Sequence, residues 1–323
     1  MGHAENFYLE NFSLAGVVGE SIVFESGNPL NYFEAIEAPH QIERINISGK
    51  LFIASSDNLS PAVIVVPGSL GVGENHLQHA ETIVSQGITA FVIDPFTNRN
   101  VESTVANQTP FSFAASAFDV LMALETIAKH PRIDANRISA QGHSRGGSAV
   151  LMASTRQFAD PIIGSNLCFE GVYAVYPWCG HQFLKPSVGH TKVRAIVGER
   201  DDWLSVQQVQ SQIQAVALDG GDASIRIVKG ASHSFDWDEE VYEIPEASVA
   251  PEAPTVYLDA TGAMIDPVTG EANSLSTDRT HFLAAIEGGF GRRGAHVGSS
   301  GEQAYIFRED MLQFHKSTLR VYG

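Results

Sequence analysis

The chain has 323 residues, of which 44% are hydrophobic and 18% charged, a composition typical of a globular protein with a sizeable core. Its 37 acidic and 20 basic residues give a formal net charge of −17, so its field repels phosphate backbones and anionic lipid surfaces, and we expect no nucleic-acid or membrane partner. No apolar stretch approaches the ~18 residues of a membrane span, and the N-terminus lacks the basic and apolar regions of a secretory signal, so we expect a cytoplasmic protein. Two cysteines, Cys168 and Cys179, are too few for a disulfide framework or a cysteine-based zinc site, while a single bridge between them stays open.

The first 60 residues predict strands at one edge of a sheet. Residues 17–26 and 42–54 alternate apolar and polar side chains, as strands with one covered face do. The continuous β-branched run at 62–66 is instead typical of a strand buried on both faces of a parallel sheet. We therefore expect the two early strands to form an antiparallel edge beside a parallel centre.

Residues 61–235, the expected core, repeat a strand and helix pattern. A helix capped by Asn75 and ended by Gly87 precedes a strand at 90–93. The same pattern then continues, with helices at 112–129, after 142 and from a capping box at Ser205, and with strands at 137–141, 172–176, 193–197 and 224–228. This alternation predicts an α/β fold with a mostly parallel sheet, helices on both faces and ligands at the carboxyl ends of the strands.

The segment 236–300 interrupts this rhythm. It has six acidic and no basic residues between 238 and 252, a hairpin-like stretch at 257–262 and a buried-looking apolar run at 282–286. Within a single domain over 1–323, we expect this insertion to fold over the strand ends and to shape a pocket; an acidic loop in solvent is the alternative. Residues 301–323 predict a final helix, capped at Ser300 with Gln303 at its third position.

A G-x-S-x-G motif, Gly142-His143-Ser144-Arg145-Gly146, directly follows a predicted strand and opens a predicted helix. In that context the motif forms a sharp turn that exposes the serine, and glycines are needed where a side chain would collide with the neighbouring strand or helix. The placement favours Ser144 as a nucleophile over a serine that merely caps a helix.

A serine hydroxyl needs a base, and the base needs an acid that orients it. Asp201, in the loop after the strand at 193–197, and His233, after the last strand, follow Ser144 in the order that such a fold requires. Asp202 would be the acid if the alignment were shifted by one residue, and His281 and His296 are reserve bases. We predict a Ser144, His233 and Asp201 triad.

Acyl transfer also needs donors for the oxyanion, and the backbone N–H groups of Arg145 and Ser69 are expected to supply them. Phosphate binding is an alternative for the Gly-rich loop at 68–73. It is disfavoured, because the loop lacks the glycine spacing and the lysine of a phosphate-binding loop. Several mostly aromatic residues near strand ends are candidates for a substrate pocket, with core packing as the alternative. The candidates are Leu70, Phe96, His143, Trp178, Trp203, Phe235 and Trp237.

No cofactor or metal is expected. His76 and His79 share a helix face, but no set of carboxylate partners accompanies them in the sequence, and we interpret both as surface residues.

These motifs resemble the dienelactone hydrolase branch of the α/β-hydrolases. The resemblance runs from about Pro61 to Phe235 and rests on the matching segments 67–71, 94–96, 134–138, 142–147, 198–201 and 231–235. It implies an α/β-hydrolase fold and cofactor-free hydrolysis of small carboxylic esters or lactones through an acyl-enzyme. The chain departs from the family's namesake enzymes, which carry a cysteine nucleophile and an acidic residue in the oxyanion loop, because it has Ser144 and Gly68 there.

Two other functions stay open on the sequence alone. Amide or peptide hydrolysis uses the same machinery, and a protein of this fold can bind small molecules without catalysis. The complete set of triad candidates favours an enzyme, and a homo-oligomer is left open.

Overall fold

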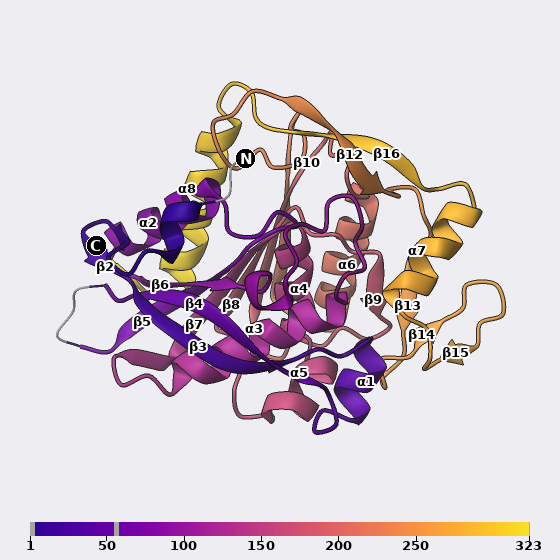
Figure 1. Cartoon of the computed structure of the whole chain (residues 1–323), viewed down its shortest axis with the longest axis horizontal. Coiled ribbons are helices and arrows are strands. Elements are labelled where there is room, and N and C mark those ends of the chain that lie inside the picture. Colours follow the sequence, from indigo (N-terminus) through magenta and orange to yellow (C-terminus); the bar gives the residue numbers. More distant parts are fainter. Residues whose placement is uncertain (1–3, 55–57, 323) are drawn as a thin grey trace.

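The computed structural model describes residues 4–54 and 58–322. Within these residues, eight strands form the central sheet in the order β11-β10-β8-β7-β5-β6-β4-β3 (Figure 1). Strands β5 to β8, β10 and β11 pair in parallel, whereas β4 pairs antiparallel with both β3 and β6. The predicted parallel sheet with an antiparallel edge is therefore confirmed, and the fold is that of the α/β-hydrolases.

The sheet strands lie close to the predicted ranges. They are β3 (Glu20–Gly27), β4 (Arg44–Phe52), β5 (Ser60–Val66), β6 (Thr89–Asp94), β7 (Ile133–His143), β8 (Gly171–Val175), β10 (Lys192–Gly198) and β11 (Ala223–Val228). Every residue of β5 and β6 is buried, because helices cover both faces of the sheet at its centre. The β-branched run at 62–66 thus forms a central strand, as its composition predicts.

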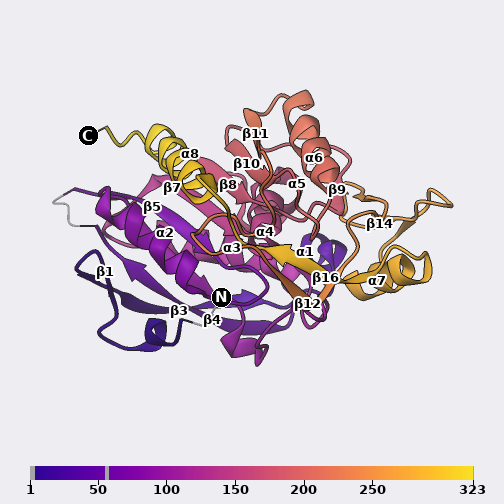
Figure 2. The same ribbon diagram turned by 90° about the horizontal axis from the view of Figure 1, so that it is seen from above.

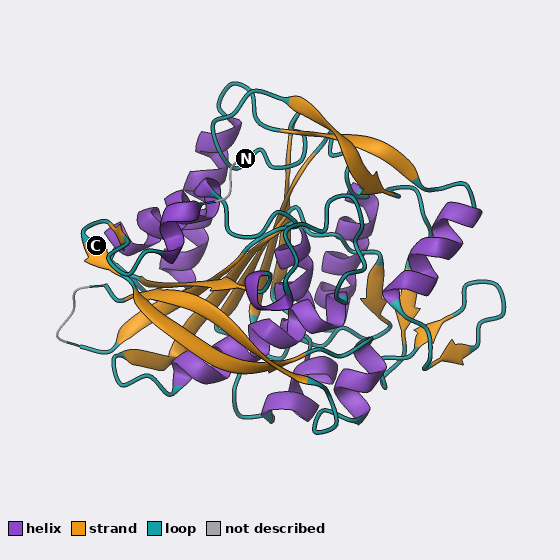
Figure 3. Cartoon of the chain, in the orientation of Figure 1, coloured by secondary structure: helices purple, strands orange, loops and turns teal. Residues whose placement is uncertain are grey.

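Helices cover the two faces of the sheet (Figure 3). Their bounds are α1 (Tyr32–Glu37), α2 (Glu74–Ser85), α3 (Phe113–Ala128), α4 (Arg145–Ser154), α5 (Arg156–Ile163), α6 (Val206–Leu218), α7 (Asp278–Glu287) and α8 (Gln303–Thr318). Helices α2 and α8 lie on one face, and α3, α4 and α6 lie on the other (Figure 1). Because α4 follows β7 directly, the turn between them lies at the carboxyl edge of the sheet.

Two predicted helix caps are wrong. Helix α2 has Gly73 as its N-cap, and Asn75 lies inside its first turn, where its side chain bonds elsewhere. Helix α8 begins at Gln303 after the N-cap Glu302, so Ser300 does not cap it, although the Gln303 side chain does accept a hydrogen bond from the Ser300 N–H at 2.8 Å. In both cases the N-cap lies two residues away from the polar residue that the pattern favoured.

The segment 236–300 is folded, and its first and last parts form a ribbon of two antiparallel strands, β12 (Tyr242–Val249) and β16 (Arg292–Val297). The ribbon crosses above the carboxyl ends of the central strands (Figure 1), and Figure 2 shows it from above. Their pairing is interrupted between Ile244 and Ser248, where Pro245 lacks a backbone N–H.

The rest of this segment forms a second, smaller sheet. The hairpin-like stretch is a hairpin of β13 (Val256–Leu258) and β14 (Met264–Ile265), joined by β15 (Ala272–Asn273) and, on the other side, by β9 (His181–Phe183) from the core. The expectation of a buried run at 282–286 is wrong, because α7 lies at the periphery and leaves Leu283 and Ile286 exposed.

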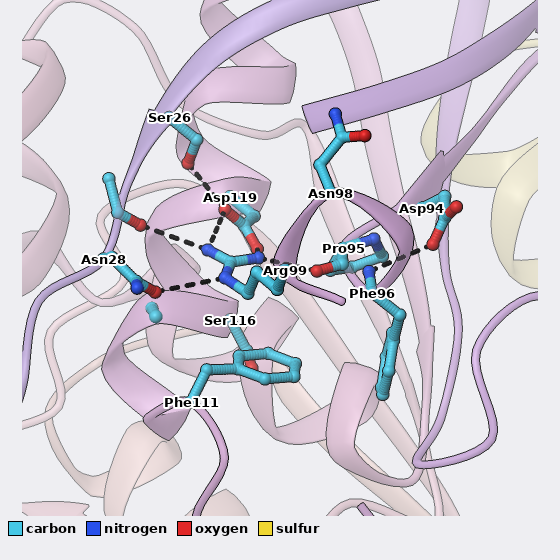
Figure 4. Close-up of polar contacts among 12 residues, drawn as sticks. Ser26, Asn28, Asp94, Pro95, Phe96, Asn98, Arg99, Phe111, Ser116 and Asp119 are labelled. Carbon is cyan, nitrogen blue, oxygen red and sulfur yellow. Dashed lines mark hydrogen bonds and ion pairs between the residues drawn. The ribbon is translucent and has the colours of Figure 1, made fainter. Parts of the chain in front are cut away.

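A buried ion pair fixes the loop after β6 against α3. Arg99 donates to both carboxylate oxygens of Asp119, at 2.7 and 3.0 Å, and Ser26 donates to the same carboxylate at 2.6 Å (Figure 4). Both charged side chains are almost fully buried, and the guanidinium lies 4.7 Å from the centre of the Phe111 ring. The pair thereby joins three segments that are distant in sequence.

Removing the carboxylate is expected to be costly. Asp119→Ala leaves the buried Arg99 charge without its partner, and we expect a loss of about 3–5 kcal/mol in the free energy of unfolding. The matched control is Glu125→Ala, which breaks the exposed pair with Lys129 on the same helix and should cost about 0.3–0.5 kcal/mol. Urea unfolding of both variants measures the difference; equal losses would contradict a stabilising role for the buried pair.

Two further observations concern the whole chain. Among the described residues, no helix is both long and apolar enough to cross a membrane. Cys168 and Cys179 are both free, so the bridge that the sequence left open is absent from the structure.

Candidate active site

Ser144 lies at the sharp turn between β7 and α4. Its backbone has φ 52° and ψ −113°, a conformation that residues other than glycine rarely adopt. Its N–H donates to the Val175 carbonyl of β8 at 2.9 Å, which ties the turn to the neighbouring strand. The turn places Ser144 in the lining of two cavities at the carboxyl ends of the strands.

Three glycines make this turn possible. A Cβ atom on Gly142 would lie 2.0 Å from the Gly146 carbonyl oxygen, and one on Gly146 would lie 2.4 Å from the Val66 oxygen. A Cβ atom on Gly147 would lie 2.8 Å from the oxygen of Val175. The prediction that side chains would collide around the motif is confirmed, because the obstacle is rigid backbone in each case.

His233 connects Ser144 to Asp201. Its Nδ1 lies 2.7 Å from Asp201 Oδ2, and its Nε2 lies 2.9 Å from Ser144 Oγ. Since the carboxylate can only accept, Nδ1 carries the proton and Nε2 is free to accept from the hydroxyl. The other carboxylate oxygen, Oδ1, accepts from the backbone N–H groups of Trp203 and Leu204, which fixes the orientation of Asp201.

Aromatic rings hold the imidazole from two sides. The Trp203 ring stacks on His233 with centres 5.1 Å apart, and the Tyr176 ring lies 4.5 Å from it. Tyr176 and Ser234, like Ser144, have a positive φ, and all three line the same cavity. Such strained backbone conformations are found mainly at functional sites. They cost energy, and they persist only where contacts with the surrounding structure hold them in place.

The alternative acid and bases have other partners. Asp202 accepts hydrogen bonds from the backbone N–H and the Nδ1 of His296, both at 2.8 Å. His281 pairs with His181 at 2.7 Å. The structure thus brings Asp201 to His233 and turns Asp202 towards β16.

The loop after β5 lies directly against the Ser144 turn. A Cβ atom on Gly68 would lie 3.2 Å from the His143 carbonyl oxygen and 3.3 Å from the Ser144 Cβ. Ser69 follows and lines both cavities together with Ser144. The absence of a side chain at residue 68 therefore permits the close approach of this loop to the Ser144 turn.

The side chain of Arg145 is buried beneath the site. Its guanidinium donates to the Ser116 hydroxyl and the Gln108 carbonyl, and it lies between the rings of Phe111 and Phe113 at 4.3 and 4.2 Å. Burial lowers the pKa of Arg145 to about 10. Arg145 thus anchors the loop after β6 to the start of α4.

Two small cavities meet at Ser144. Both are lined by Ser69, Ser144 and Trp203, and the segment 236–300 supplies Ile244 and Val297 to the first. The same segment supplies residues 248–250 and Phe282 to the second, which shares five lining residues with a third cavity further out. The five are Gln108, Ser248, Val249, Ala250 and Phe282.

Four of the seven predicted pocket residues line these cavities. Leu70 and His143 line the first cavity, Trp178 lines the second and Trp203 lines both.

The other three predictions are wrong. Phe96 packs edge to face on Phe111 in a separate apolar cluster (Figure 4), and Phe235 is fully buried in the main core. The Trp237 indole donates to Glu239 at 2.9 Å and lines neither cavity.

A comparison with protein families identifies the chain. The model of the family described as "Dienelactone hydrolase family" matches residues 50–256, more than half of the chain. This protein belongs to the dienelactone hydrolase family. The matched region contains Ser144, Asp201 and His233, and it ends within the segment 236–300.

Curated relatives of this family member include two cutinases. The chain is 27% identical over 156 residues to "Cutinase" of Thermobifida fusca (strain YX), which covers 45% of this chain and 50% of the relative. It is 27% identical over 109 residues to "Cutinase est2" of Thermobifida alba, which covers 34% and 35%. The chain thus spans half or less of the length of these relatives. Among solved structures, Thermogutta terrifontis esterase 2 matches with a TM-score of 0.48 and 14% identity, over 68% of this chain and 85% of that one.

Behind the first cavity, this member of the family has a buried polar cluster that the sequence analysis missed. The Asp236 carboxylate accepts hydrogen bonds from Asn75 at 3.0 Å, His79 at 2.8 Å and Tyr176 at 2.7 Å. Burial opposes ionisation of Asp236, but hydrogen bonds from His143 and His79 hold its pKa well below the ordinary value. The interpretation of His76 and His79 as surface residues is wrong, because α2 turns both of them inwards.

Three members of this cluster have the geometry of a metal site. His79, His143 and Asp236 each offer one ligand atom, and these atoms lie within 4.8 Å of one another. The Asp236 oxygens already receive the donors of Asn75, His79 and Tyr176, so the charge is satisfied by hydrogen bonds. We assign no metal here.

Proposed function

We propose that this protein hydrolyses carboxylic esters through an acyl-enzyme, with Ser144 as nucleophile, His233 as general base and Asp201 as the acid that orients the base. The observation that carries the proposal is the continuous hydrogen-bond chain from Ser144 Oγ through both nitrogens of His233 to Asp201, at 2.9 and 2.7 Å. A serine at such a turn, paired with a base of the correct tautomer, is the arrangement that acyl transfer requires.

In the first half of the reaction, Ser144 Oγ attacks the ester carbonyl carbon and its proton passes to His233 Nε2. The negative charge that develops on the carbonyl oxygen is stabilised by the N–H groups of Ser69 and Arg145. The carbon–oxygen bond to the alcohol then breaks, and the departing alkoxide takes the proton from His233. Asp201 stabilises the imidazolium that exists between these two proton transfers.

In the second half, a water molecule attacks the acyl carbon and gives a proton to His233. The bond to Ser144 breaks, the serine oxygen recovers that proton, and the carboxylic acid leaves. Each step uses groups of this chain and water alone. The two small cavities that meet at Ser144 are the candidate places for the acyl and alcohol parts of a small ester or lactone.

A panel of substrates tests this proposal. p-Nitrophenyl acetate, butyrate and octanoate, δ-valerolactone and p-nitroanilide amides are compared at equal enzyme concentration. We expect turnover of esters or lactones and little turnover of amides, because an amine is the poorer leaving group. Turnover of amides alone would favour the peptidase alternative, and binding without turnover of any substrate would favour a non-catalytic protein.

A further inference from the structure

His233 determines which of the two cavities at Ser144 suits the alcohol part of an ester. In the proposed mechanism the departing alkoxide takes its proton from His233 Nε2, so the alcohol oxygen must lie within hydrogen-bond reach of that atom. His233 lines the first cavity together with Ser234, whereas neither residue lines the second. The alcohol part therefore belongs in the first cavity, and the acyl part is left with the second.

The second cavity has aromatic walls beside Ser144. Three rings pack together there, with centres 4.5 Å apart for Phe113 and Trp178 and 5.7 Å apart for Trp178 and Phe282. Phe113 begins α3, Trp178 follows β8 and Phe282 belongs to α7, so these walls combine the core with the segment 236–300. The cavity is small, and only the first atoms of an acyl chain can lie in it.

The third cavity offers room for the rest of an acyl chain. It shares Gln108, residues 248–250 and Phe282 with the second cavity, so the two are neighbours along the same walls. Its volume of about 300 Å³ is at the lower end of the range of small-molecule pockets, and it is much larger than either cavity at Ser144. The path from Ser144 thus leads outwards past Phe282, towards α7 beside the end of the β12–β16 ribbon (Figure 2).

One face of α7 gives the third cavity an apolar wall. Phe282, Leu283 and Ile286 recur there at helical spacing. Leu283 and Ile286 are 47% and 58% exposed, so an alkyl chain that lies on them removes apolar surface from water. Arg279 and Arg293 also line the cavity, and such side chains cover apolar surface with their methylene stems while their charged ends stay in water.

We propose that the second and third cavities together form an acyl groove, so that the preferred substrates are esters of medium-length aliphatic carboxylic acids with small alcohols. This inference rests on the proposed ester hydrolysis and specifies its substrate class. The segment 236–300 determines the preferred acyl length, because it supplies residues 248–250 and α7 to the walls of the groove.

Isomeric esters test the direction of the groove. Ethyl octanoate and octyl acetate contain the same atoms and release similar alcohols, but they carry the long chain on the acyl side and on the alcohol side, respectively. Ethyl butyrate and butyl acetate form the short pair. By pH-stat measurement of kcat/KM, we expect the wild type to favour ethyl octanoate over octyl acetate by about tenfold more than it favours ethyl butyrate over butyl acetate, because each buried methylene group stabilises the bound ester.

Leu283→Glu supplies the second arm, because it places a charge on the apolar wall while changing an exposed helix residue. We expect the ratio of kcat/KM between ethyl octanoate and ethyl butyrate to fall by about fivefold or more, since a charged wall no longer favours an alkyl chain. The matched control is Leu275→Glu, the same change at a residue that is 84% exposed and lines none of the three cavities. It should keep the wild-type ratio, and circular dichroism checks that both variants are folded.

The outcomes separate the two proposals. With ester turnover intact, a preference for octyl acetate would place the long chain in the first cavity, and equal rates on the two long isomers would show that no groove selects the acyl chain; either result overturns the inference. A ratio that folded Leu283→Glu retains would place the acyl chain away from α7 and also overturn it. Failure of the wild type on every ester would overturn the proposed function, and this inference with it.

Discussion

Replacing Ser144 by alanine is expected to lower the turnover of esters by several powers of ten, on the order of 10⁴–10⁶. The change removes the attacking oxygen while leaving the oxyanion donors and the cavity walls in place, so a small residual activity should persist. Since only one hydroxyl is lost, the unfolding free energy should change little. Initial rates on p-nitrophenyl butyrate, with thermal unfolding of the same samples, measure both effects.

The matched control is Ser154→Ala, which removes a serine hydroxyl from the far end of the same helix, α4. That hydroxyl donates to the Leu151 carbonyl at 2.7 Å and does not line either cavity at Ser144. It should retain wild-type turnover. If Ser144→Ala kept more than about a tenth of the wild-type rate, Ser144 would not be the nucleophile.

The second large effect is expected from Asp201→Asn. The backbone N–H groups of Trp203 and Leu204 would hold the amide oxygen where Oδ1 lies now, so the amide nitrogen would face His233. His233 Nδ1 would then have to accept, its proton would move to Nε2, and Nε2 could no longer take the proton of Ser144. A loss of roughly 10⁴ in kcat is expected, as for the equivalent change in a serine protease.

Asp202→Asn is the matched control, because it makes the same chemical change one residue away. Asp202 binds His296, and an amide oxygen can still accept from the His296 backbone N–H. We expect this variant to retain most of its kcat. The opposite result, a severe loss in Asp202→Asn and a mild one in Asp201→Asn, would exchange the roles of the two carboxylates.

Local patterns were sufficient to predict the central sheet and the positions of the three candidate triad residues. The run at 62–66 is typical of a buried strand, and the glycines around Ser144 specify a turn that no bulkier sequence can form. Asp201 and His233 follow from chain order, because the carboxyl ends of parallel strands meet at one edge. These inferences need no knowledge of which distant segments pack together.

The wrong predictions concern residues whose surroundings are formed by segments that are distant in the sequence. His79 packs against Phe307 of α8 and bonds to Asp236, and both partners come more than 150 residues later. Strand β12 was weakly periodic on its own and forms because β16, over 40 residues away, pairs with it. Phe235 lies two residues after His233, yet it packs into the core, because closeness in sequence does not determine side-chain direction.

The β12–β16 ribbon limits how far the substrate preference of this protein can be changed by grafting the segment 236–300 from a related protein. Strand β16 and the residue after it are bonded next to two members of the candidate triad: the Gly298 N–H donates to the His233 carbonyl at 2.9 Å, and His296 binds Asp202 beside Asp201. A graft that replaced 236–300 as a module would therefore remove supports of the base and the acid along with the cavity wall. We expect such chimeras to lose rate before they change selectivity, unless residues 296–298 are retained from this chain.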